Sequence, residues 1–297
     1  MSEEITAKLT GARAGGLCFT AMTCIFVIIS FIGQTILTAA GCTGVLYYFI
    51  SSLFSIISMF TVITAVNFAR HEKLSLGRYM RKCSLRYAGY SVLFAAGMFL
   101  GLGFVNALAA RLVISLGGRV NGIELPVESP FALILFLFCY AFLPAIEEEA
   151  FFRGLITESL SRAKIVPAAF CSAAAFALYH GSLTQLLYQF IYGVGLFFIA
   201  KKSGSALPGA IAHFINNAAV LVFSYVGIEI DLFNPFIIAG GVILLAAFVW
   251  LIARDKSDIK TEPAKKNEVS RFFVPFGAIG TAVFVVTMIA NALQGAV

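Results

Sequence analysis

Long apolar runs alternate with short polar segments along the whole 297-residue chain. A helix needs about 20 mostly apolar residues to cross a hydrocarbon core about 30 Å thick. Five runs have this length and predict membrane-spanning helices at 15–37, 45–68, 87–110, 206–226 and 274–297. Two shorter apolar runs, at 183–200 and 236–253, are also expected to cross. The pattern therefore predicts a polytopic membrane protein.

Two further helices have an unusual pattern. The apolar stretch from Phe131 to Ile146 continues past three glutamates toward Leu160, which predicts one long, interrupted helix. A helix over 167–180 covers only about 20 Å at about 1.5 Å per residue, and Gly181-Ser182 then reverses the chain. We expect this helix to end within the membrane, with His180 at its tip. The predicted fold is an all-α polytopic bundle of about nine helices.

Composition supports a membrane protein. Apolar residues make up 60% of the chain and charged residues only 12%, whereas soluble domains are about 25% charged. A soluble domain of this composition would expose too much apolar surface, so we expect the bilayer to be its solvent. The net charge of +6 is interpreted as a sign of topology, and no nucleic-acid partner is predicted.

The distribution of basic residues predicts the orientation. Lys and Arg collect on the cytoplasmic side of membrane proteins. With nine crossings and the N-terminus inside, the inner segments hold 18 of the 21 basic residues: Lys8, Arg13, Arg70, Lys73, Arg78, Arg81, Lys82, Arg86, Arg162, Lys164, Lys201, Lys202, Arg254, Lys256, Lys260, Lys265, Lys266 and Arg271. The outer segments hold only Arg111 and Arg119, and Arg153 lies within a helix. The C-terminus is therefore predicted to lie outside.

Three carboxylates and an arginine interrupt the fourth apolar stretch. Ionisable groups at membrane depth are costly and usually face the bundle interior, where they have a function. Glu149 and Arg153 are four residues apart and share a helix face, so they can pair. Glu148 points about 100° away and is free to act as a general base. The alternative is structural: the acidic run ends the helix at the interface, and Arg153 extends its side chain toward water.

Two of the three histidines in the chain also lie in predicted helices. His180 follows Phe176 by four residues, and His213 precedes Asn217 by four, so each pair shares a helix face. A lone histidine in an apolar helix is more often a packed core residue, and His71, in a basic loop, is interpreted as uninvolved. Two such pairs together with the acidic helix favour a functional site.

These motifs, in this order, resemble the CPBP intramembrane proteases, a family that includes CaaX prenyl endopeptidases and bacterial homologues linked to bacteriocin processing and self-immunity. Family members carry two adjacent glutamates with an arginine four after the second, then Phe-x-x-x-His, then His-x-x-x-Asn. The matching residues here are Glu148, Glu149, Arg153, Phe176, His180, His213 and Asn217. Phe152-Arg153-Gly154 and Tyr179-His180-Gly181-Ser182 resemble the bacterial branch.

Glu147 creates a second possible register for the glutamate pair. Pairing Glu147 with Glu148 would put Phe152 where the family has arginine, so Glu148 and Glu149 are kept. Asn216 raises a similar ambiguity beside Asn217.

The resemblance implies a domain organisation and a location. We expect a single polytopic membrane domain, 1–297, with a catalytic core over 129–226 and flanking membrane helices in 1–128 and 227–297. The expected location is the plasma membrane of a bacterium, which the chain crosses several times. Its expected partners are membrane lipid and a peptide or protein substrate, prenylated or not.

The resemblance also implies peptide-bond hydrolysis. Glu148 would be the general base, polarising a water together with His180, while His213 and Asn217 would donate hydrogen bonds to the oxyanion. Glu149 and Arg153 would orient the site. Two histidines and a glutamate are also a donor set for zinc, as in a metalloprotease, but they lie on three helices and no His-Glu-x-x-His motif is present. No metal is assigned, and the question stays open.

Two other classes of function remain as alternatives. A non-catalytic membrane partner, such as an immunity or scaffold protein with the same fold, predicts that changing Glu148 leaves function intact. A transporter would use the buried charges as an ion or proton pathway. The sequence has no pair of broken helices in corresponding halves, which makes a transporter the weakest of the three hypotheses.

Overall fold

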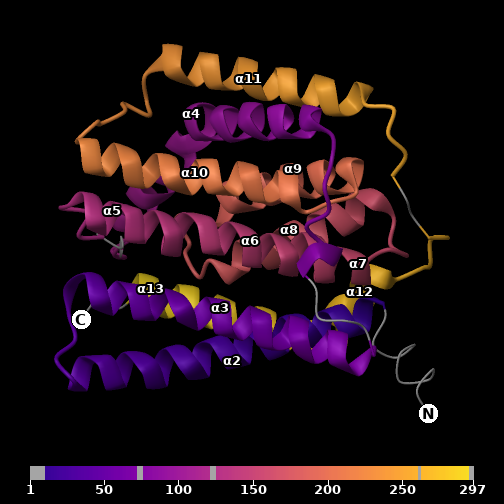
Figure 1. The fold of residues 1–297 in the computed structure, drawn as a ribbon, viewed down its shortest axis with the longest axis horizontal. Coiled ribbons are helices and arrows are strands. Elements are labelled where there is room, and N and C mark those ends of the chain that lie inside the picture. The colour runs from indigo at the N-terminus through magenta and orange to yellow at the C-terminus, as the bar shows by residue number, and fades with distance from the viewer. Residues whose placement is uncertain (1–10, 72–75, 121–124, 260–261, 294–297) are drawn as a thin grey trace.

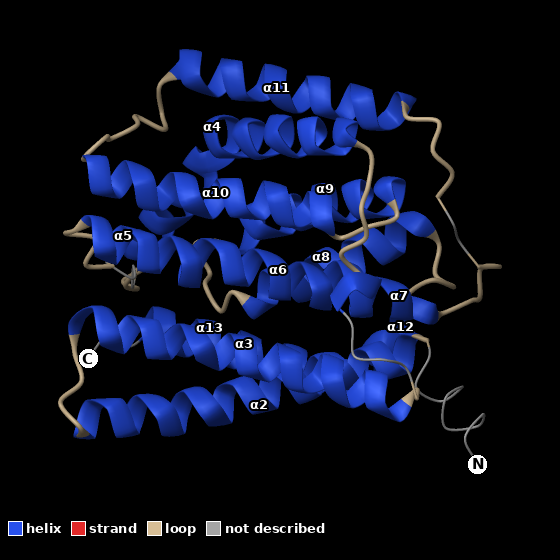
Figure 2. Cartoon of the chain, in the orientation of Figure 1, coloured by secondary structure: helices blue, strands red, loops and turns tan. Residues whose placement is uncertain are grey.

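The computed structural model describes residues 11–71, 76–120, 125–259 and 262–293. All regular secondary structure in these ranges is helical (Figure 2). Three of the basic residues used for the topology, Lys8, Lys73 and Lys260, lie outside the described residues, as does the segment 294–297 of the last predicted span.

The described part of the chain forms nine successive helical rods and one short turn of helix, η1 (Leu76–Arg78). The rods are α2 (Ala12–Ala39), α3 (Gly44–Ala69), α4 (Leu85–Ser115), a composite helix (Pro130–Ser159), α8 (Ile165–Tyr179), α9 (Leu186–Ser203), α10 (Leu207–Val226), α11 (Pro235–Arg254) and a final helix (Glu268–Leu293) built from α12, η4 and α13. The prediction of about nine helices is confirmed, and Figure 1 shows the rods packed nearly side by side.

Seven of the described helices are long and apolar enough to cross a membrane: α2, α3, α4, the composite helix, α10, α11 and the final helix. The predicted short helix, α8, has 15 residues. The predicted crossing at 183–200 is not confirmed, because the corresponding helix α9 includes Lys201 and Lys202 in its last turn and is not among the seven. Large apolar side chains face outward along the rods, and Phe31 and Phe236 are 74% and 86% exposed. Such a surface suits lipid contact, and the chain is a multi-pass membrane protein.

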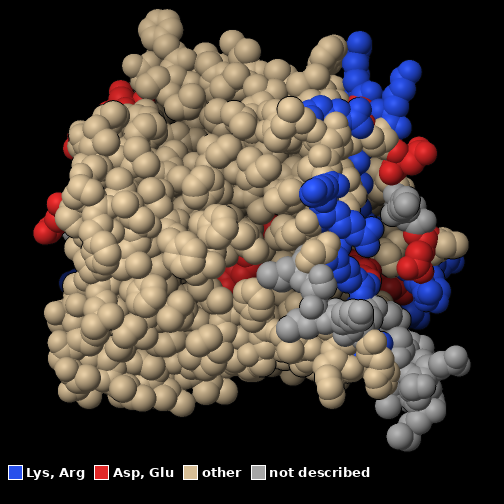
Figure 3. All heavy atoms as spheres, viewed as in Figure 1, with Lys and Arg blue, Asp and Glu red and all other residues tan. Residues whose placement is uncertain are grey.

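Charge is concentrated at one end of the bundle. Figure 3 shows Lys and Arg side chains gathered at the right-hand end of the visible face, whereas the middle of that face carries few charged atoms. In Figure 1, α2 begins at this end and α13 finishes at the opposite end, as an odd number of passages requires. Basic residues gather on the cytoplasmic side of membrane proteins in general. Which end faces the cytoplasm stays a prediction.

The composite helix lies in the centre of the bundle and contacts α3, α9 and α10. It runs through α5 (Pro130–Phe136), η2 (Leu137–Phe142), α6 (Leu143–Glu149), η3 (Ala150–Ile156) and α7 (Thr157–Ser159). The segments η2 and η3 are π-helical, and such segments are frequent at functional sites. Pro144, the second residue of α6 after η2, lacks the backbone N–H that the regular pattern of helical hydrogen bonds needs. The predicted interruption is therefore confirmed, with the three glutamates between the two π-helical segments.

The short helix α8 ends as the sequence predicts. Its last residue is Tyr179, His180 caps it, and Gly181 has φ of +58°, a left-handed conformation that glycine adopts without strain. The chain thus turns at Gly181, and the His180 side chain stays at the tip of the helix.

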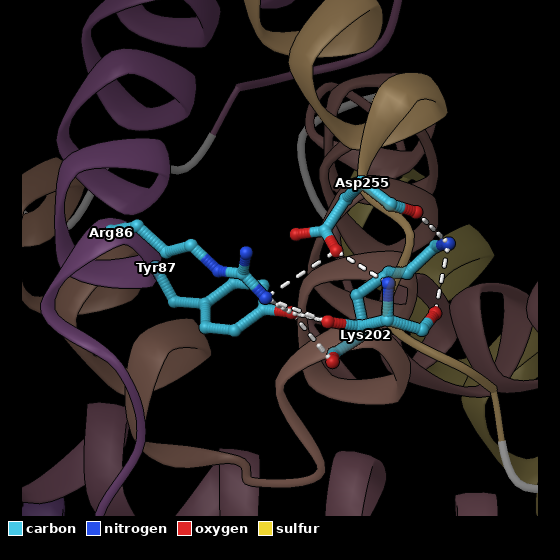
Figure 4. A network of polar contacts seen from close by, with 5 residues as sticks. Arg86, Tyr87, Lys202 and Asp255 are labelled. Carbon is cyan, nitrogen blue, oxygen red and sulfur yellow. Dashed lines mark hydrogen bonds and ion pairs between the residues drawn. The ribbon is translucent and has the colours of Figure 1, made fainter.

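Polar contacts tie α4, α9 and the end of α11 together at the basic end (Figure 4). The Tyr87 hydroxyl donates to the carbonyl of Lys202 at 2.7 Å, and the Lys202 ammonium donates to the carbonyl of Asp255 at 2.6 Å. Burial alone would raise the pKa of Asp255, but hydrogen bonds from Ser257 and Tyr87 and the charge of Arg86 hold that pKa below its usual value. Asp255 is therefore ionised, and its contacts connect the ends of α4, α9 and α11.

Candidate active site

A buried ion pair forms the base of the site. Arg153 Nη1 lies 3.1 Å from Glu149 Oε1, and neither side chain is exposed. The two residues are one helical turn apart, as the sequence predicts. The Arg153 guanidinium also lies 4.1 Å from the centre of the Phe176 ring on α8. Burial of a charge is costly unless it is paired, so these two contacts hold Arg153 in place.

His213, on α10, lies between the two predicted glutamates. Its Nδ1 is 3.7 Å from Glu149 Oε1, and its Nε2 is 3.9 Å from Glu148 Oε2. Glu148 is 7% exposed, and its Oε2 has no hydrogen-bond partner among the described residues. This buried oxygen faces His213 and keeps its capacity to accept a hydrogen bond.

His180 is held in one orientation by the backbone of its own helix. Its Nδ1 lies 2.9 Å from the carbonyl oxygen of Phe176. A carbonyl oxygen only accepts hydrogen bonds, so Nδ1 carries the hydrogen and Nε2 keeps a lone pair. The Phe176 ring packs edge-on against both His180 and His213, at 4.7 and 5.8 Å between ring centres. Phe176 therefore links the two histidines.

Asn217 lies one turn beyond His213 and has different partners. Its Nδ2 donates to the carbonyl of Tyr140 in η2 at 3.0 Å, and its Oδ1 accepts from Asn216 Nδ2 at 3.3 Å. The Tyr188 hydroxyl donates in turn to Asn216 Oδ1 at 2.7 Å. Within the described residues Asn217 makes no hydrogen bond to the other five predicted residues. In this structure Asn217 contacts η2 of the composite helix and Asn216, and its place in the active site stays a prediction.

Glu147 is directed away from His213. One of its oxygens accepts a hydrogen bond at 2.9 Å from the Ser55 hydroxyl on α3, and its side chain is buried. Glu148 and Glu149, not Glu147, are the carboxylates beside His213. This arrangement favours the register in which Glu148 and Glu149 form the pair.

Three residues near the site were missed by the sequence analysis: Ser55, Tyr188 and Gly209. For Tyr188 the sequence offers one indication, since Tyr192 follows it by four residues and the two share a helix face. In the structure the two rings stack, with 5.9 Å between their centres. Gly209 likewise precedes His213 by four residues and so shares its helix face. Ser55 lies in an apolar helix rich in serine, and the sequence contains nothing that distinguishes it.

Gly209 lets α10 approach Glu149 closely. A Cβ atom at position 209 would lie 2.5 Å from Glu149 Oε2. We expect Gly209→Ala to displace the Glu149 carboxylate and to destabilise the protein by about 1–3 kcal/mol. Thermal unfolding in detergent measures this loss. Gly240→Ala on α11 is the control, because a Cβ there meets no atom within 4 Å. Equal stability of Gly209→Ala and Gly240→Ala would contradict the close approach.

The donor geometry does not fit a metal centre. Among the described residues, no group of three or more His, Cys, Asp or Glu side chains is placed to share a metal ion. Metal dependence, which the sequence left open, is therefore not supported, and no reaction step is derived through a metal.

The fold and the site together define a class: a multi-pass helical membrane protein with a buried cluster of carboxylates, histidines and an arginine inside its central helices. Residues 130–219 match the family model described as Type II CAAX prenyl endopeptidase Rce1-like. This segment, under a third of the chain, contains all six predicted site residues and confirms the resemblance to the CPBP proteases. No curated protein and no solved structure matches the chain. The bacterial branch and the plasma membrane stay predictions.

Proposed function

We propose that this protein is an intramembrane endopeptidase in which Glu148 activates a water molecule to hydrolyse a peptide bond. The family match implies an endopeptidase; the roles of the residues and the substrate are the proposal. The main support for this proposal is the position of His213, whose ring lies 3.9 Å from Glu148 and 3.7 Å from Glu149 in a buried cluster. Clusters of buried ionisable groups are typical of catalytic sites.

In the proposed reaction, Glu148 accepts a proton from water while the water oxygen attacks the carbonyl carbon of the substrate. The carbonyl oxygen becomes the oxyanion of a tetrahedral intermediate. The carbon–nitrogen bond then breaks, and the proton held by Glu148 passes to the leaving nitrogen. The products are a new carboxyl group and a new amine. The position of Glu148 beside His213 in the buried cluster supports this role.

His180 is proposed to orient the attacking water. Because its Nδ1 hydrogen is directed at the Phe176 carbonyl, its Nε2 can accept a hydrogen bond from that water. The backbone contact fixes the ring, so the acceptor is positioned before the substrate binds.

His213 and Asn217 are proposed to donate hydrogen bonds to the oxyanion. One N–H of the Asn217 amide is directed at the Tyr140 carbonyl, which leaves the second for the substrate. The contact from Asn216 to Asn217 Oδ1 fixes which side of the amide carries the hydrogens. Loss of one such donor typically lowers kcat about 10²–10³-fold.

The Tyr188 hydroxyl is expected to act on the reaction through Asn216 and Asn217. Tyr188→Phe removes one hydrogen bond, worth about 0.5–1.5 kcal/mol, and should lower kcat by roughly two- to tenfold with little change in KM. Steady-state kinetics on a cleaved peptide measures both constants. Tyr225→Phe is the control, because Tyr225 lies exposed on α10. An unchanged kcat in Tyr188→Phe would show that the network does not position Asn217.

A panel of peptides tests the proposed function. The purified protein in detergent is incubated with quenched fluorescent peptides, some prenylated and some not, beside the His180→Ala variant. We expect the wild type to cleave at least one peptide and His180→Ala to lose most of that activity. A zinc chelator in parallel samples decides whether a metal takes part. If no peptide is cleaved while a cellular phenotype survives Glu148→Ala, the non-catalytic immunity or scaffold role is the better account.

Recognition of a prenyl group on the substrate is also part of the proposal. The description of the matched family names prenylated CAAX substrates, and this chain is proposed to act on a membrane-associated or lipid-modified peptide or protein. Faster cleavage of prenylated than of unmodified peptides of the same sequence supports a lipid-modified substrate.

A further inference from the structure

A cavity of about 510 Å³ opens at the basic end of the bundle. Its walls include the end of η1 and the segment after it, the junction of η3 with α7, and the turn from α9 into α10. Neither glutamate of the Glu148–Glu149 pair lines it, nor do His180, His213 and Asn217. The volume is in the range typical of small-molecule sites, about 300–1,000 Å³.

The lining of this cavity is predominantly positive. Its charged residues are Arg78, Arg81, Arg153, Lys201, Lys202, Glu158 and Asp258. Arg78 and Arg70 both form ion pairs with Glu158, so its negative charge is already compensated. The cavity therefore favours an anionic ligand.

Arg153 provides buried donors at the wall of the cavity. Its side chain is fully buried, and only its Nη1 faces Glu149 in the ion pair. The Nε and Nη2 atoms have no hydrogen-bond partner among the described residues. A buried guanidinium without enough acceptors is costly, so Arg153 adds an incompletely compensated positive charge at this wall of the cavity, and an anion in the cavity would reduce that cost.

The two neighbouring lysines have different surroundings. The Lys202 ammonium is already engaged by the carbonyls of Asp255 and Ser257, as Figure 4 shows for Asp255. The Lys201 ammonium lies 5.9 Å from the Phe197 ring, and no carboxylate in the described part of the chain lies within ion-pair distance. Arg81 is exposed and uses its Nε for the carbonyl of Arg78. Lys201 and Arg81 therefore have donors available to a ligand.

We propose that this cavity binds a phosphate group, either that of an anionic lipid headgroup or free phosphate. Phosphate oxygens accept several hydrogen bonds at once and suit guanidinium and ammonium donors. The cavity lies at an end of the bundle, where lipid headgroups surround a membrane protein, and basic pockets between helices at that depth bind such headgroups. This inference does not depend on the proposed peptidase activity.

Lipid retention and phosphate binding test the site separately. The protein is reconstituted in nanodiscs of phosphatidylcholine containing phosphatidylglycerol, and native mass spectrometry measures which lipid is retained. In a second arm, inorganic phosphate is titrated into the protein in detergent, and the rise in the unfolding temperature is followed. Lys201→Gln and Arg81→Gln remove the accessible cations. Arg254→Gln is the matched control, an exposed cation at the same end that does not line the cavity.

We expect the wild type to retain phosphatidylglycerol in preference to phosphatidylcholine, and each cavity variant to weaken that retention about fivefold. Arg254→Gln should behave as the wild type. If the effect of the variants is confined to the inorganic phosphate arm, free phosphate is the source of the group. The proposal is overturned if Arg254→Gln loses as much as the cavity variants, or if the wild type neither prefers the anionic lipid nor responds to phosphate.

Discussion

Glu148→Gln is expected to lower kcat for peptide hydrolysis by about 10²–10⁴-fold, the usual contribution of a positioned general base. Glutamine has nearly the same size and can still contact His213, but it cannot accept the proton of the attacking water. KM should change little, because the proposed role of Glu148 lies in the chemical step. Steady-state kinetics on the best-cleaved peptide measures both constants.

Glu147→Gln is the matched control for this substitution. Glu147 is the preceding residue, is equally buried, and contacts Ser55 on α3 instead of His213. Its variant should keep most of the wild-type kcat. If Glu147→Gln is the inactive variant and Glu148→Gln stays active, the other register of the glutamate pair is correct and the assignment of the base fails.

Arg153→Met is expected to destabilise the protein by about 3–5 kcal/mol. The substitution removes the charge that compensates Glu149, and both side chains of this pair are fully buried. Breaking such a pair by removing one partner leaves an unpaired charge in a medium that solvates it poorly. The midpoint of thermal unfolding in detergent, compared between wild type and variant, measures the loss.

The double variant Glu149→Gln/Arg153→Met distinguishes the stability contributed by the ion pair from the separate contributions of the two residues. Without either charge, the site no longer holds an uncompensated ion, so the double variant should be more stable than Arg153→Met alone. A double variant that loses the sum of the two single losses would mean that Glu149 and Arg153 contribute independently, and the ion pair would not explain their stabilising effect.

The outline of the fold was accessible from the sequence because the bilayer sets the length of each apolar run. The runs at 15–37 and 45–68, for example, correspond to α2 and α3, each extended by a few residues. The end of α8 at Tyr179 was also predictable, because Gly181 adopts a left-handed conformation without strain. Helical spacing correctly predicted that Glu149 and Arg153 would pair.

Contacts between helices could not be predicted in the same way. Spacing identifies residues that share a face of one helix, but it does not say which other helix that face meets. The hydrogen bonds from Ser55 to Glu147 and from Tyr188 to Asn216 join separate helices, and the spacing of residues within one helix does not predict either of them. The π-helical segments η2 and η3 were not predicted from the sequence.

The central claim is that the buried Glu148 site hydrolyses a peptide bond with water. Its most direct test is cleavage of the peptide panel by the wild-type protein in water enriched in oxygen-18, with the fragments weighed by mass spectrometry. The account predicts two fragments from at least one peptide, with oxygen-18 in the newly formed carboxyl group and none in reactions with Glu148→Gln. Intact peptides throughout, or fragments that form equally well with Glu148→Gln, would contradict it.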